Sequence, residues 1–123
     1  MTSLFTFIII TLSNSNPFIW VLNNDLTVRK ESLQKLLSAY ESNGTGVFGS
    51  ITLKSENPDV VNFGGGNTDN TKEAFDYNAY EGCLLEEYYK KTQLRKVQSV
   101  EGSSMLIPLQ VIENHGFMRE DFF

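Results

Sequence analysis

The segment PFIWVLN, residues 17–23, constrains the fold more than any other part of the sequence. Its apolar residues follow one another without alternation, which is typical of a strand covered on both faces. Asn23, Asn24 and Asp25 come next, so the chain leaves this strand through two amides and a carboxylate. The sequence therefore predicts a buried strand with a polar loop at its end.

A helix is predicted after this strand, from about Arg29 to Ser42. One apolar stripe recurs there at helical spacing: Leu33, Leu36, Leu37 and Tyr40. Gly44 suits the left-handed residue that ends a helix. Residues 46–53, GVFGSITL, then indicate a second strand. Because strand–helix–strand units are normally parallel and right-handed, we expect an α/β fold with helices against a mainly parallel sheet.

The remaining segments are predicted by shorter patterns. Strands are expected at 59–63, 96–100 and 103–107, a loop at 64–70, and a helix from Pro108 to about Asn114 that ends at Gly116. Residues 71–93 give no clear pattern, although the spacing of Glu86 and Glu87 before Lys90 and Lys91 would support a helix.

The N-terminal run LFTFIIITL, residues 4–12, has two interpretations. It is apolar enough for the core of a signal peptide, but no Lys or Arg precedes it and no small-residue cleavage site follows. It is too short for a transmembrane helix, which needs about 20 apolar residues. We favour a buried strand or a helical segment that covers a sheet.

Composition excludes several function classes. A chain of 123 residues suffices for one small domain. Its net charge of −5 argues against broad electrostatic binding to nucleic acid or anionic lipid. The single cysteine, Cys83, makes no internal disulfide and no metal-ligand pattern, which favours a reducing compartment.

The triplet Asn23-Asn24-Asp25 also has two interpretations. Asn and Asp bond to their own backbone, so the triplet is a good turn sequence and helix start. In open α/β sheets, however, ligands bind beyond the carboxyl ends of strands, where Asp25 would lie. A carboxylate with nearby amide oxygens suits a hard cation such as Mg²⁺ or Mn²⁺.

Three segments in register resemble the family 2 glycosyltransferases, in particular the bacterial branch that contains rhamnosyltransferases of cell-surface polysaccharide synthesis. The segments are FIWVLNNDLTVRKESLQKLL with its NND triplet, GSSMLI at 102–107, and GFMREDFF at 116–123. The resemblance covers residues 18–123, whereas residues 1–17 do not match. It implies a partial GT-A domain, a Rossmann-like three-layer sandwich with a mixed, mainly parallel sheet.

The resemblance also implies a site and its ligands. Asp25 would ligate a Mg²⁺ or Mn²⁺ ion that bridges the diphosphate of a nucleoside-diphosphate sugar, and Asn23 and Asn24 would line the same site. Gly102, Ser103 and Ser104 would form the floor of the pocket for donor sugar and acceptor. The acceptor would be a saccharide or a lipid-linked molecule, and the protein would act in the cytoplasm or at the inner face of the membrane.

Two parts of the family pattern are missing from the sequence. No strand–helix pair with an acidic residue for the nucleotide base precedes Phe18, and no acidic pair that would supply the catalytic base follows Phe123. Asp121 lies before the two phenylalanines, so it is not that base. We therefore expect a fragment of the domain that does not catalyse on its own and whose catalytic residue is unknown. The alternative is a non-catalytic remnant or partner-binding α/β module that self-associates through exposed sheet surface.

Two further features carry competing interpretations. The GGGN segment, 64–67, could cradle a phosphate with backbone N–H groups, but it lacks the Lys-Ser/Thr of a P-loop, so a flexible loop is favoured. His115 could be a metal ligand or base. Its place before Gly116 at a helix end favours a capping role instead.

Other reactive side chains are given structural roles. Cys83 lacks a nearby His or basic setting and is not expected to be a nucleophile. Glu86 and Glu87 are adjacent on one helix and do not face each other, so a solvated face is favoured over an acid–base pair. Tyr77 or Tyr80 could stack on a sugar, although aromatic residues here are first expected in the core.

Overall fold

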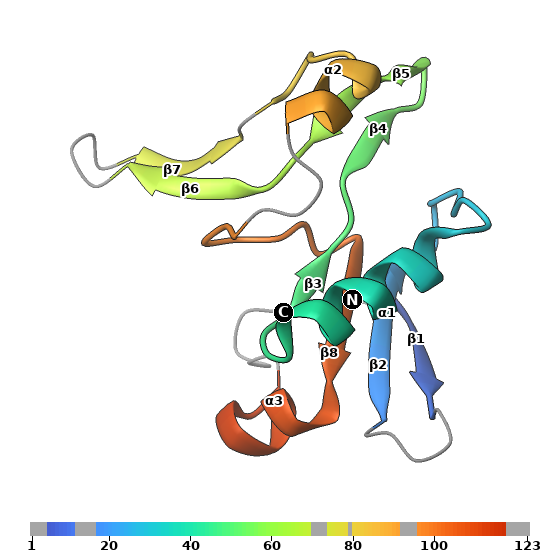
Figure 1. Cartoon of the computed structure of the whole chain (residues 1–123), viewed down its shortest axis with the longest axis vertical. Coiled ribbons are helices and arrows are strands. Elements are labelled where there is room, and N and C mark those ends of the chain that lie inside the picture. Colours follow the sequence, from blue (N-terminus) through green and yellow to red (C-terminus); the bar gives the residue numbers. More distant parts are fainter. Residues whose placement is uncertain (1–4, 12–16, 70–73, 79, 92–95, 118–123) are drawn as a thin grey trace. The chain divides into compact units, whose positions relative to one another are not determined.

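The computed structural model describes residues 5–11, 17–69, 74–78, 80–91 and 96–117. The chain divides into two compact units. The first comprises Met1–Phe48 and Gly102–Phe123, and the second comprises Gly49–Glu101. Both contain helices and strands (Figure 1), which confirms the predicted mixed α/β class.

A four-stranded sheet in the order β1-β2-β8-β3 organises the first unit. Its strands are β1 (Phe5–Ile10), β2 (Phe18–Asn23), β8 (Ser104–Pro108) and β3 (Phe48–Gly49), of which Gly49 is the first residue of the second unit. β2 is antiparallel to β1 on one side and to β8 on the other, with Ile19 between Ile9 and Ile107. The strand predicted from the unbroken apolar run is therefore an interior strand with a partner along each edge.

The core of this unit lies between the sheet and α1 (Ser32–Asn43). Its buried members are Phe18, Trp20, Leu36, Leu37 and Leu106. Because side chains alternate along a strand, Phe18 and Trp20 share this face of β2, and Val21 lies on the other. Val21 has no exposed surface, so both faces of β2 are covered, as its sequence predicted.

Helix α1 begins at Ser32 rather than Arg29, because the residues before it form a turn in which the Ser32 N–H donates to the Arg29 carbonyl. The predicted end is confirmed: Gly44 has φ of 78° and its N–H donates to the carbonyl of Tyr40 over 2.6 Å. The Tyr40 ring packs edge-on against Phe18, with centroids 4.8 Å apart. The predicted apolar stripe therefore packs α1 against the sheet.

Pro108 is the last residue of β8 and precedes α3 (Leu109–His115), so it is not the first helical residue as predicted. Its ψ of 137° is extended, which suits the end of a strand. The N–H of Leu109 donates to the carbonyl of Pro17 at 3.0 Å and ties the start of α3 to the start of β2. Gly116 ends the helix, as the sequence predicted.

The second unit contains two hairpins and a short helix: β4 (Thr52–Lys54), β5 (Asn57–Phe63), β6 (Gly66–Asp69), β7 (Ala74–Asn78) and α2 (Leu85–Lys91). Val61 and Tyr88 are its buried hydrophobic residues among those described. The Val61 N–H donates to the Cys83 carbonyl, and the Gly82 N–H donates to the Val61 carbonyl, both at 2.9 Å. These bonds fix the segment before α2 against β5.

The expected mainly parallel sheet is wrong for the pairings that the structure gives. β1–β2, β2–β8, β4–β5 and β6–β7 are all antiparallel. Residues 46–53 form β3 and β4 instead of one strand, 64–70 includes β6, and 96–100 forms only a bridge from Ser99 to Gly66. The three glycines at 64–66 carry no side-chain pattern, so pairing with another segment determined their conformation.

The predicted strand–helix–strand unit is present as β2, α1 and β3, with β8 between its two strands. In Figure 1, β3 runs opposite to β8, and so in the direction of β2. An antiparallel strand therefore separates two strands that a parallel sheet would have paired directly. Each strand of this sheet is therefore antiparallel to its neighbours.

Replacement of Leu106 by alanine tests the core. Leu106 has no exposed surface, so Leu106→Ala should lower the free energy of unfolding by about 3 kcal/mol through lost burial and a cavity. Urea unfolding followed by Trp20 fluorescence measures the change. Val28→Ala, at an apolar residue that is 41% exposed, should change it by less than about 0.5 kcal/mol. Equal effects of the two variants would contradict the described core.

Replacement of Gly49 by alanine tests a close contact in the second unit. A Cβ on Gly49 would lie 2.5 Å from the Cβ of Val100, so Gly49→Ala should destabilise the protein by about 1–3 kcal/mol. Gly102→Ala is the matched control, because its Cβ would meet no atom within 4 Å. Thermal unfolding followed by circular dichroism compares them. A neutral Gly49→Ala would show that Val100 does not pack there.

Candidate functional site

Two predicted motifs that are distant in the sequence meet at one corner of the first unit. The backbone N–H of Asn23 donates to the carbonyl oxygen of Ser103 over 2.9 Å. The strand register sets this contact, because Leu22 lies opposite Ser104. The end of β2 thus adjoins the start of β8. We call the six residues of these motifs the polar corner: Asn23, Asn24, Asp25, Gly102, Ser103 and Ser104.

Asn24 and Asp25 form a turn directly after β2, and both are exposed. A loop separates them from α1, which begins at Ser32. The turn interpretation of the triplet is therefore confirmed, and its role as a helix start is wrong. An exposed turn leaves the Asp25 carboxylate accessible to a ligand from solvent.

Asp25 supplies the one carboxylate of the polar corner. Within the described ranges, no three His, Cys, Asp or Glu side chains gather in a way that could hold a metal ion. Mg²⁺ is commonly held by one or two carboxylates together with phosphate oxygens of a substrate. The corner therefore fits an ion that arrives with a phosphate ligand, and it does not fit an ion held by protein side chains alone.

Ser103 carries a buried hydroxyl oxygen that has no hydrogen-bond partner in the described part of the chain. Buried polar atoms are nearly always paired, so such an atom calls for an explanation. Beside it, a Cβ on Gly102 would meet open space. This hydroxyl is therefore a buried donor without an acceptor among the described residues.

Ser104 has a structural contact that the sequence did not reveal. Its side chain is buried, and its hydroxyl oxygen accepts a hydrogen bond from Trp20 Nε1 at 3.1 Å. Both residues lie on the face of the sheet that carries the core. No local pattern could have indicated this bond, because its partners come from different motifs. Ser104 thus fixes β8 against β2 at the polar corner.

The glycine segment 64–67 uses its backbone groups internally. The Gly66 N–H donates to the Ser99 carbonyl at 3.0 Å, and the Gly66 carbonyl accepts from the N–H groups of Gln98 and Ser99 at 3.1 Å. Gly64, Gly65 and Gly66 are buried. Since the Gly66 donor is occupied, this N–H is not available to cradle a phosphate. Glycine here permits a buried backbone pairing.

The positions of His115, Glu86 and Cys83 agree with the structural roles that the sequence predicted for them. His115 is the exposed last residue of α3, next to Gly116. Glu86 forms an exposed ion pair with Lys90 at 3.2 Å, as expected of a solvated face. The Cys83 thiol lies 3.9 Å from a carboxylate oxygen of Glu87. The thiol donates a weak hydrogen bond there, which is a structural contact.

Of Tyr77 and Tyr80, the two candidates for stacking on a sugar, the structure describes the side chain of Tyr80. Tyr80 has a positive φ of 71°, and its ring packs edge-on against Tyr88 with centroids 5.2 Å apart. The side chain of Tyr77 and all of residues 118–123, including Asp121, lie outside the described residues. Tyr80 is therefore part of an aromatic cluster, as the core interpretation predicted.

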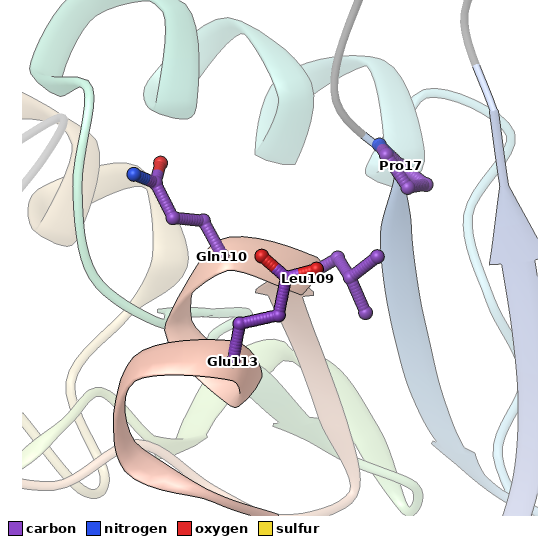
Figure 2. A pocket seen from close by; sticks show the side chains of 4 residues that line it. All are labelled: Pro17, Leu109, Gln110 and Glu113. Atoms are coloured by element: carbon purple, nitrogen blue, oxygen red, sulfur yellow. The ribbon is translucent and has the colours of Figure 1, made fainter.

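A shallow hollow of about 210 Å³ lies away from the polar corner. Pro17, Leu109, Gln110 and Glu113 line it (Figure 2). Pro17 precedes the first residue of β2, whereas Asn23 is the last. A six-residue strand spans about 20 Å, so the hollow and the polar corner are at opposite ends of β2.

No model of a protein family matches the chain, and neither does a curated protein or a solved structure. Among the helices in the described ranges, none has the length and hydropathy needed to cross a membrane.

Two neighbouring serines give a matched test of this corner. Ser104→Ala would leave the buried Trp20 N–H without its acceptor, which should cost about 1–3 kcal/mol of unfolding free energy. Ser103→Ala removes a buried hydroxyl without a partner in the described residues, so it should be neutral or slightly stabilising. Chemical unfolding and the Trp20 emission maximum measure both. A larger cost for Ser103→Ala than for Ser104→Ala would contradict this geometry.

Proposed function

We propose that the polar corner binds the diphosphate of a nucleoside-diphosphate sugar together with Mg²⁺ or Mn²⁺. In this proposal the first unit is part of a GT-A domain of the family 2 glycosyltransferases, in the rhamnosyltransferase-like branch. The observation that carries it is the hydrogen bond from the Asn23 N–H to the Ser103 carbonyl. It joins two segments that the motif resemblance independently assigned to one site.

The residues at the corner have complementary roles. Asp25 is exposed and offers a carboxylate oxygen to the cation, whose remaining ligands come from the diphosphate and water. The cation supplies charge neutralisation to a departing diphosphate. Asn23 and Asn24 offer amide groups beside it, and the Ser103 hydroxyl is a buried donor without a partner in the described residues. Gly102 leaves space for a sugar or acceptor close to the backbone.

The arrangement of elements supports the proposal in part. A strand that ends in the metal-binding triplet, the helix α1 after it and the strand β3 beyond it occur in the expected order. The antiparallel pairings of β2 with β1 and β8 differ from the mainly parallel sheet that the resemblance implies. The acceptor would be a saccharide or a lipid-linked molecule in cell-surface polysaccharide synthesis, handled in the cytoplasm or at the inner face of the membrane.

Binding of the sugar donor and transfer of the sugar require different groups. The corner supplies groups that hold a diphosphate, but no residue is assigned as the base that activates the acceptor. The proposal is therefore for donor binding, with sugar transfer dependent on groups beyond the polar corner. The second candidate function is a non-catalytic partner-binding module, and the exposed Ile9 on the edge strand β1 favours it.

A thermal-shift experiment tests donor binding. The chain is heated with Mn²⁺ alone and with Mn²⁺ plus uridine, guanosine, thymidine or cytidine diphosphate. At ten times its Kd, a ligand that binds only the native state adds about 1.4 kcal/mol, which raises Tm by about 5 °C. We expect this rise with one or more of the nucleotides and no comparable rise with Mn²⁺ alone.

The control for this experiment is a matched pair of substitutions. Asp25→Asn should abolish the rise, because the amide does not replace a carboxylate as a hard-cation ligand. Asp59→Asn makes the same change at another exposed residue and should preserve it. The absence of any nucleotide-dependent rise in the unmodified chain, or an equal loss in both variants, would overturn the proposal.

A further inference from the structure

Strand β1 is an edge of the four-stranded sheet. All six of its residues pair with β2, from Phe5 opposite Asn23 to Ile10 opposite Phe18. Among the described residues, no strand pairs with its other side. That side presents backbone N–H and C=O groups that another strand could pair with.

This edge lacks the features that normally block such pairing. Natural edge strands are protected by charged side chains, proline, bulges or very short length. Residues 5–10, FTFIII, contain no charge and no proline, and their register with β2 has no bulge. Ile9 is 74% exposed and Ile8 is 39% exposed. The opposite edge strand, β3, is only two residues long, so it is protected by its length.

The charge distribution indicates what kind of partner suits this edge. Residues 1–24 contain no Asp, Glu, Lys or Arg, so the chain's net charge of −5 comes entirely from residues beyond them. Two copies of a negatively charged chain repel each other over most of their surface. At β1 they would meet without like charges, and a neutral apolar strand is complementary to itself.

We propose that β1 pairs antiparallel with β1 of a second copy of this chain, across a two-fold axis perpendicular to the sheet. The pairing joins two four-stranded sheets into one of eight strands. The axis keeps corresponding faces together, so Ile9 of each copy stays in the apolar row that contains Ile19 and Ile107. The exposed isoleucine then packs against the partner strand.

The pairing also closes the assembly. An isologous contact uses the same surface on both copies, so it leaves no second β1 edge for a third copy. The remaining edges are the short β3 strands. A dimer is therefore expected in place of an open-ended fibre. Because the contact is one short strand on each side, the dimer should be weak and its population should depend on concentration.

Sedimentation velocity between 5 and 200 µM tests this proposal on the full chain. The unmodified protein should change from monomer to dimer across this range. Ile9→Lys places a charge on each β1 and should weaken dimerisation by about tenfold or more, since charged residues block edge pairing. Val28→Lys adds the same charge at another exposed apolar residue of the first unit and should dimerise like the unmodified chain. Circular dichroism checks that all three are folded.

Amide hydrogen exchange of the unmodified chain provides a readout that does not depend on a variant's folding. Exchange within residues 5–10 should slow as concentration rises, because outward N–H groups become bonded in the dimer. A monomer at all concentrations, assemblies that grow beyond a dimer, or equal weakening by Ile9→Lys and Val28→Lys would each overturn the proposal. A monomer at all concentrations would show that this edge does not pair with its own copy.

Discussion

The indole Nε1 of Trp20 donates to the Ser104 hydroxyl over 3.1 Å, inside the core that α1 closes. This bond joins β2 to β8, and on β8 it is one residue from Ser103, whose carbonyl accepts from the Asn23 N–H. It satisfies a buried donor that would otherwise be costly, and it holds two strands in one register. A slip of one residue would move every side chain of β8 to the other face of the sheet. The core and the polar corner therefore depend on the same pairing.

Several elements were predictable because their signal is local. The apolar run before Asn23 is enough to indicate a strand covered on both faces, and Val21 is indeed fully buried. The stripe that includes Leu36 and Leu37 indicates α1, and Gly44 indicates its end through its left-handed conformation. Each of these signals depends on a few neighbouring residues, so no tertiary contact could readily override it.

Strand direction and partners were not predictable, because they depend on residues far apart in the sequence. An unbroken apolar run suits a parallel strand, but an interior antiparallel strand between β1 and β8 satisfies the same burial. The glycines at 64–66 indicated a loop, yet Gly66 pairs with Ser99. At the candidate site, the turn at Asn24 and Asp25 followed from residue type, whereas the role of Ser104 depended on Trp20. The sequence motifs predicted which residues belong to the polar corner. The register of β2 with β8 is what places the two motifs side by side.

Charge separates the two surfaces for which we propose ligands. The chain has no charged residue before Asp25, which is the first carboxylate and also the proposed cation ligand. The neutral hairpin of β1 and β2 suits contact with its own copy, and the exposed turn that follows suits a cation and a phosphate. The two proposals use different residues and different physical interactions. Either can fail without affecting the other.

A titration with a nucleoside diphosphate and Mg²⁺, followed through backbone amide chemical shifts, shows whether the polar corner binds this ligand. We expect the shifts to concentrate at two segments, Asn23–Asp25 and Gly102–Ser104, and Asp25→Asn to remove them. Shifts that instead cluster at the hollow lined by Pro17, Leu109, Gln110 and Glu113, or no shifts at millimolar nucleotide, would contradict this expectation.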